Sequence, residues 1–225
     1  MGGPELVPAR VGCVMDSLPI EIVIALVASQ CICFFAFMGA SGIAYRYRLL
    51  AVYLYGAILA TIFTEQASVP QLFVLPIMAV LRFVACLEVA HRQTEGFRYW
   101  SRLMASVMLL ASAAAGVVWL GFGARDAFGM VIEIRRGMQV WSAGMFLALE
   151  CCWLAVGGGW YRRADRIAGA FTLLALNHGT VSLLRTFGAG DWQELHGGSW
   201  LVEVACYLVL TWAILNVQKR EPDPL

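Results

Sequence analysis

Charged residues are scarce in this chain of 225 residues: they make up 14% of it, whereas hydrophobic residues make up 60%. Soluble domains carry about 25% charged residues, so too little polar chain is present here to cover a water-soluble body. The net charge of +1 also argues against a nucleic-acid partner, which would require a basic face. The composition therefore predicts a protein that lies in a lipid bilayer.

Lysine and histidine are nearly absent, which excludes several cofactors. The single lysine, Lys219, follows the last apolar stretch, so a retinal Schiff base inside the membrane is excluded. His91, His178 and His196 fall at three different expected depths, so neither a bis-histidine haem nor an intramembrane zinc site is expected. No nucleophile, metal triad or acid/base pair can be assembled at one depth, so we name no catalytic residue and rank an intramembrane enzyme last.

What the chain does contain is seven long apolar stretches separated by short polar connections. A stretch of about 20 apolar residues matches the thickness of the hydrocarbon layer, about 30 Å. The sequence predicts an all-α fold, a single bundle of seven transmembrane helices, with spans at about residues 19–39, 47–64, 69–90, 103–122, 138–156, 167–187 and 200–217. The short connections predict that consecutive helices are antiparallel neighbours.

The basic residues between the spans predict the orientation. Ten of them fall on the side of the C-terminus and four on the other, and cytoplasmic loops carry the excess of basic residues. We therefore expect an outside N-terminus, a cytoplasmic C-terminus and a multi-pass location in the plasma or inner membrane. The first stretch lacks a basic leader, so we expect it to be a retained helix.

Small residues in the fourth stretch predict a close helix contact. Ser112 and Gly116 are four residues apart, and small side chains at this spacing let two helix backbones approach each other in lipid. We interpret this face as a packing surface.

Two charges in the third and fifth stretches are expected deep in the membrane. Counting from the expected helix starts places Arg82 and Glu150 at a similar depth. A charge at the bilayer centre costs at least about 2.5 kcal/mol, so it should find a partner. We predict an Arg82–Glu150 ion pair; the alternative is that each side chain reaches the cytoplasmic edge separately.

A third group of polar residues lies at the expected cytoplasmic end of the third stretch. Glu88 has His91 and Arg92 three and four residues further along, which is the spacing of neighbours on a helix. We interpret these three residues as a cytoplasmic-end cluster and not as a metal site.

The last two stretches carry polar residues on facing sides. One stripe contains His178, Ser182 and Arg185, with Asn177 adjacent, and the other contains Glu203, Tyr207 and Thr211. We predict an Arg185–Glu203 pair, which either joins two helices or lines a polar pocket that opens outward. His178 is either a proton-sensitive group or a satisfied packing donor. Asn177 binds either His178 or an adjacent helix, and Gln30 is a further candidate for a hydrogen bond between helices.

These polar residues favour a small transporter, channel or sensor whose intramembrane site takes an ion or small polar solute. The candidates for this site are Arg82, Glu150, Asn177, His178, Arg185, Glu203 and Tyr207. The alternative is a non-catalytic structural or accessory subunit, which would bind other membrane subunits or further copies of itself. In both cases the lipid bilayer is the main partner.

Overall fold

The computed structural model describes residues 19–40, 42–66, 71–94, 127–155, 162–186 and 192–216. These residues form seven helices: α1 (Ile20–Gly39), α2 (Ile43–Arg46), α3 (Arg48–Gln66), α4 (Gln71–Thr94), α6 (Ala127–Ala155), α7 (Arg163–Thr186) and α8 (Trp192–Leu215). The predicted all-α class is confirmed for this part of the chain. The expected span at 103–122, with Ser112 and Gly116, lies outside the described residues.

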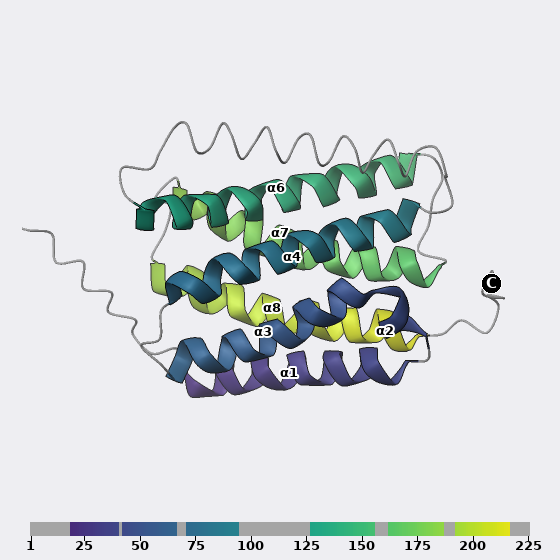
Figure 1. Ribbon diagram of the computed structural model, residues 1–225, viewed down its shortest axis with the longest axis horizontal. Coiled ribbons are helices and arrows are strands. Elements are labelled where there is room, and N and C mark those ends of the chain that lie inside the picture. The colour runs from purple at the N-terminus through teal and green to yellow at the C-terminus, as the bar shows by residue number, and fades with distance from the viewer. Residues whose placement is uncertain are drawn as a thin grey trace, which may run out of the picture.

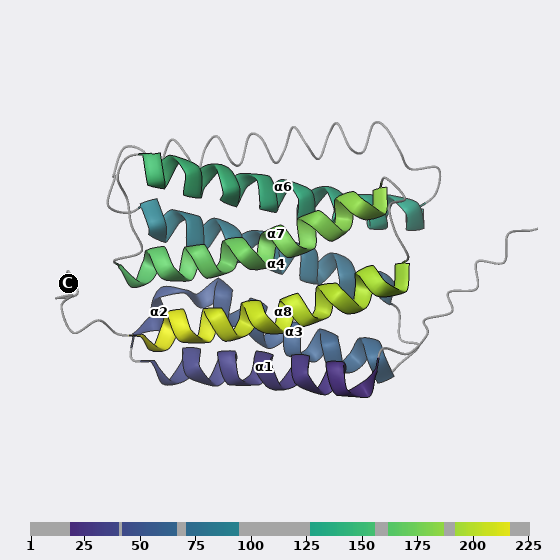
Figure 2. The same ribbon diagram turned by 180° about the vertical axis from the view of Figure 1, so that it is seen from behind.

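The six long helices lie side by side in one bundle (Figures 1 and 2). Around the bundle, α1 contacts α3, α3 contacts α4, α4 contacts α6, α6 contacts α7, α7 contacts α8, and α8 contacts α1. The ring is crossed in the middle, where α4 also contacts α7. Inward-facing side chains of α4, α7 and α8 are therefore shielded from the surroundings.

Three of these helices contain segments long and apolar enough to cross a membrane: Ile20–Gly39, Arg163–Leu184 and Gly197–Leu215. A fourth apolar segment, Arg48–Phe63, is shorter. Large apolar side chains are exposed on the outer faces of α1 and α8, among them Ile24, Phe35, Leu208 and Trp212. Such surfaces are costly in water and favourable in lipid, so the three segments indicate a location in a membrane.

Aromatic side chains join three helices in the core. The ring of Phe171 on α7 is fully buried and meets Tyr53 of α3 at 5.8 Å and Phe146 of α6 at 5.7 Å between ring centroids. Both contacts are edge-on, the arrangement that the charge distribution of aromatic rings favours. Phe171 therefore fixes the spacing of α3, α6 and α7 on one side of the bundle.

Two helices begin earlier than the sequence predicts. We expected starts near Met138 and Trp200, but α6 begins at Ala127 and α8 at Trp192. An apolar run marks the part of a helix in hydrocarbon, while backbone hydrogen bonding continues through polar turns beyond it. The 29 residues of α6 span about 43 Å, which exceeds a hydrocarbon layer of about 30 Å. This difference changes the expected depth of every residue counted from these starts.

Candidate functional site

Three helices meet at their midpoints around a buried polar group. Arg82, Leu174 and Glu203 are each the twelfth residue of a helix of 24 residues, in α4, α7 and α8 respectively. At 1.5 Å per residue, each lies about 18 Å from either end of its helix. This is the depth at which a charge is most expensive in a membrane.

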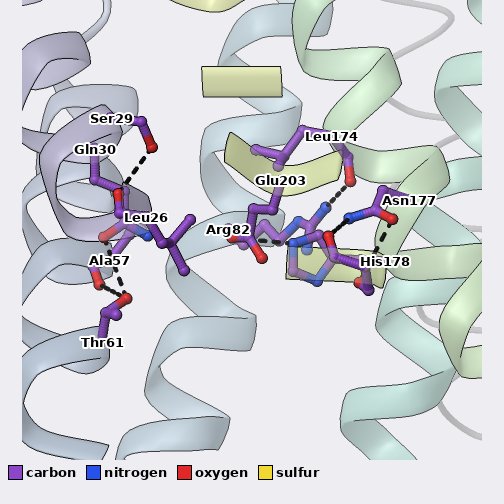
Figure 3. Close-up of polar contacts among 11 residues, drawn as sticks. Leu26, Ser29, Gln30, Ala57, Thr61, Arg82, Leu174, Asn177, His178 and Glu203 are labelled. Atoms are coloured by element: carbon purple, nitrogen blue, oxygen red, sulfur yellow. Dashed lines mark hydrogen bonds and ion pairs between the residues drawn. The ribbon is translucent and has the colours of Figure 1, made fainter. Parts of the chain in front are cut away.

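Arg82 is buried at this midpoint, with 6% of its surface exposed. Its Nη2 donates a hydrogen bond to the backbone carbonyl of Leu174 at 3.0 Å (Figure 3). Its Nε is also buried and has no hydrogen bond among the described residues. A guanidinium has five N–H donors and no acceptor, so one carbonyl satisfies only part of it.

His178 and Glu203 join α7 to α8 beside this arginine. His178 Nε2 lies 3.4 Å from Glu203 Oε1, and both side chains are mostly buried. Figure 3 shows this pair next to the Arg82 side chain. An imidazole and a carboxylate at this distance attract each other strongly when the imidazole is protonated.

Two tyrosines complete the group. Tyr53 of α3 and Tyr207 of α8 are both buried, and each acts electrostatically on the other. Arg82 and Glu203 also act electrostatically on Tyr53, which places all four residues within one neighbourhood. The Tyr207 hydroxyl lies beside Tyr53 but makes no hydrogen bond of ordinary geometry among the described residues. We call the five residues Tyr53, Arg82, His178, Glu203 and Tyr207 the central cluster.

The predicted Arg82–Glu150 ion pair is wrong. Glu150 Oε1 accepts a hydrogen bond from Gln93 Nε2 at 3.0 Å, and Gln93 lies eleven residues beyond Arg82 on α4. That separation is about 16 Å along the helix, too far for an ion pair. The depth of Glu150 was counted from Met138, but because α6 begins at Ala127, Glu150 lies near the end of this helix.

Asn177 binds an adjacent helix, which was one of its two predicted roles. Its Nδ2 donates to the carbonyl of Ser199 on α8 at 3.0 Å, and Ser199 Oγ is 3.5 Å from Asn177 Oδ1. Gln30 also makes the expected contact between helices, since its Oε1 accepts from Thr61 Oγ1 of α3 at 3.2 Å. Figure 3 shows this Gln30–Thr61 pair well apart from Arg82 and His178.

Arg185 lies on α7, but its side chain is outside the described part of the structure. The predicted Arg185–Glu203 pair therefore stays a prediction. Glu203 has a described partner in His178, which sits on the same predicted stripe as Arg185. Ser182, the third member of the stripe, instead donates a hydrogen bond to Gln139 Oε1 of α6.

Glu88 has a partner that the sequence did not suggest. Its Oε2 accepts a hydrogen bond from the backbone N–H of Leu50, in the first turn of α3, at 2.9 Å. First-turn N–H groups lack acceptors within their own helix, and the positive end of the helix dipole favours a carboxylate there. Glu88 therefore caps α3 from a neighbouring helix, whereas His91 is exposed and Arg92 half-buried in the last turn of α4.

A second polar network, missed by the sequence analysis, joins the ends of α4, α6 and α7. Arg162 donates to both carboxylate oxygens of Asp165, from Nη2 at 2.9 Å and from Nε at 3.1 Å, and to the carbonyl of Gln93 at 3.0 Å. Asp165 is buried and also accepts from the backbone N–H of Arg162 at 3.2 Å. We call Gln93, Glu150, Arg162 and Asp165 the end network.

One signal for the end network was present in the sequence. An acidic residue three positions after a helix start, ahead of an apolar run, indicates a side chain that reaches back to the first turn. Arg162 and Asp165 have this spacing before the apolar part of α7. No comparable sequence signal marks Gln93. Its side chain binds Glu150, 57 positions later, and its carbonyl binds Arg162, 69 positions later.

Within the described ranges, no group of three or more potential metal ligands comes together. Comparisons with protein-family models, with curated proteins and with solved structures found no match. The chemistry of the site must therefore be argued from its own residues. The central cluster offers a fixed positive charge, two hydroxyls and a histidine–carboxylate pair able to hold a proton.

Proposed function

We propose that this chain is a small transporter, channel or sensor of the membrane, whose central cluster binds an ion or a small polar solute. The observation that carries the proposal is the position of Arg82, buried at the midpoint of α4, and of Glu203, half-buried at the midpoint of α8. Charged groups at that depth are costly and are commonly kept for a pathway or a ligand. A protein needing only helix packing would gain more from apolar residues of similar volume there.

We further propose seven spans with the N-terminus outside and the C-terminus cytoplasmic. In support, α1 and α3, α3 and α4, α6 and α7, and α7 and α8 run in opposite directions, and α8 ends at the same end of the bundle as α4 (Figure 1). Basic residues gather at this end: Arg46, Arg48, Arg92, Arg162 and Arg163. An excess of arginine is typical of the cytoplasmic face.

Cysteine labelling tests this orientation. We expect an impermeant maleimide to label Arg163→Cys only in inverted vesicles and Ile20→Cys only in intact cells, because these residues begin helices at opposite ends of the bundle. The unsubstituted chain measures the background from its native cysteines. Labelling of Arg163→Cys from outside intact cells would show that the proposed orientation is reversed.

A ligand screen tests the function. Purified protein in mild detergent is heated with salts, amino acids, sugars and nucleosides, and its unfolding midpoint is recorded. A ligand present at 100 times its Kd stabilises the folded state by about 2.7 kcal/mol. We expect at least one class of solute to raise the unfolding midpoint of the unsubstituted chain and to raise it less in Arg82→Lys, which alters the central cluster.

The matched control for this screen is Thr61→Val. It removes the buried hydrogen bond to Gln30, outside the central cluster, and should leave any ligand effect intact. If no class of solute raises the midpoint of the unsubstituted chain, the ligand-binding function is contradicted.

A second candidate is a structural or accessory subunit of a larger membrane complex. It is favoured by polar contacts that join helices away from the central cluster: Thr61 binds Gln30, and Arg162 binds both Asp165 and the carbonyl of Gln93. Stoichiometric copurification with other membrane proteins, together with no response in the ligand screen, would favour this candidate over the first.

A further inference from the structure

We infer that the ligand of the central cluster is a small monovalent anion, inorganic or carboxylate, held by Arg82, an assignment that rests on the function proposed above. The observation behind it is a buried guanidinium without a counter-charge. Among the described residues, no carboxylate oxygen lies at ion-pair distance from Arg82, and its described hydrogen bond goes to a neutral carbonyl. A buried charge in this state is strongly destabilising unless another group neutralises it.

The carboxylates on the described helices that could have neutralised Arg82 have other partners. Glu203 lies against His178 at 3.4 Å, Glu150 accepts from Gln93 at 3.0 Å, and Glu88 caps the first turn of α3. Glu203 is the nearest in position, and its contact with His178 directs one carboxylate oxygen towards the imidazole (Figure 3). The positive charge of Arg82 is thus left available to a bound group.

Two groups of the cluster can donate hydrogen bonds to a bound anion. Arg82 Nε is buried without an acceptor, and the Tyr207 hydroxyl is buried without an ordinary hydrogen bond among the described residues. Tyr207 lies beside Tyr53, whose hydroxyl is influenced by the charges of Arg82 and Glu203, so Tyr207 borders the same group of residues. The fork of a guanidinium fits carboxylate geometry and forms charge-assisted hydrogen bonds to anions.

A cation is disfavoured at the same position. Metal cations such as Ca²⁺ and Na⁺ require several oxygen ligands and a negative surrounding. Here the cluster offers one carboxylate, Glu203, which already contacts His178, and no larger group of ligands forms within the described ranges. The positive charge of Arg82 would repel a cation that approached Glu203.

Anion exchange at constant ionic strength tests this assignment. The purified full chain is kept in sodium gluconate, and chloride, nitrate, formate or acetate replaces gluconate stepwise while the unfolding midpoint is measured. We expect a saturable rise with at least one small anion at fixed sodium concentration. Losing one charge-assisted hydrogen bond should weaken binding about tenfold or more, so Arg82→Lys, which keeps the charge but not the fork, should raise the apparent Kd about tenfold.

Two further variants keep the test decisive if Arg82→Lys does not fold. Tyr207→Phe removes only a hydroxyl and should weaken the same anion several-fold, whereas Thr61→Val should not change its Kd. Equal anion affinity in Arg82→Lys, Tyr207→Phe and the unsubstituted chain would overturn the assignment.

The counter-experiment replaces sodium by potassium or choline at fixed anion. The anion assignment would be overturned if the unfolding midpoint changed with the identity of the cation and if this change were lost in Glu203→Gln. A ligand-binding function would remain in place. An unfolding midpoint raised by neutral solutes alone would likewise overturn the anion assignment but leave a ligand-binding function in place. No response to any solute would contradict both the anion and the proposed function.

Discussion

Replacing Asp165 by alanine is expected to lower the free energy of unfolding by about 3 kcal/mol, because it removes a buried carboxylate that accepts charge-assisted hydrogen bonds from the half-exposed Arg162. Asp165 is 1% exposed and accepts three hydrogen bonds from Arg162, two from the guanidinium and one from the backbone. It also places a negative charge in the first turn of α7, where the helix dipole favours it. In thermal unfolding in detergent, the loss corresponds to a midpoint lowered by about 6–12 °C.

Two variants identify the cause of this loss. Asp165→Asn keeps the shape and an acceptor for the backbone N–H but loses the charge, so we expect a smaller effect than for alanine. Arg163→Gln removes a half-buried charge in the same turn and should change stability by less than about 0.5 kcal/mol. If Asp165→Ala is no more destabilised than Arg163→Gln, the end network does not stabilise the bundle.

Replacing Gly179 by alanine is expected to destabilise the bundle by about 1–3 kcal/mol through overpacking. A Cβ atom at Gly179 of α7 would overlap the Cβ of Ala143 on α6 and lie 3.2 Å from the carbonyl oxygen of Gln139. The two helix backbones are therefore as close as glycine permits, which is the way small residues bring membrane helices together. Thermal unfolding in detergent measures the loss.

The chain offers a matched control for this substitution on the partner helix. A Cβ at Gly144 would meet nothing within 4 Å, so Gly144→Ala should be neutral or stabilising by up to about 1 kcal/mol through helix propensity. Ala143→Gly combined with Gly179→Ala should recover most of the loss, because it removes the atom that the new Cβ meets. Failure of this rescue would show that the close contact is not the cause.

The close helix contact illustrates which part of the packing could be anticipated. The sequence analysis assigned close packing to Ser112 and Gly116, which lie outside the described residues. The described contact uses Gly179, which was not distinguished from other glycines, because which helices touch depends on the order of helices around the ring. Spacing along one helix shows that it has a face of small residues, but not which neighbouring helix packs against that face.

The buried charges show the same limit. The sequence placed Arg82 deep, because it interrupts an apolar stretch, but placed Glu203 only about one turn inside the last span. Because α8 begins at Trp192, Glu203 lies instead at the midpoint of this helix. Their partners could not be obtained in this way. Glu150 was placed beside Arg82 because the start of α6 was taken from its apolar run, and eleven further helical residues moved it by about 16 Å.

By itself, the sequence determined the all-α class, the apolar segments suited to lipid and the few polar residues that a membrane makes expensive. It could do so because helix formation and transfer into hydrocarbon depend on composition and spacing along a single segment. Only the tertiary structure decided that His178 meets Glu203, that Glu88 caps α3 and that Arg82 forms no ion pair with any described carboxylate. Those contacts depend on the order of the helices in the bundle, on the helix length beyond the apolar run and on the rotation of each helix about its axis. None of these can be predicted from one segment of the sequence alone.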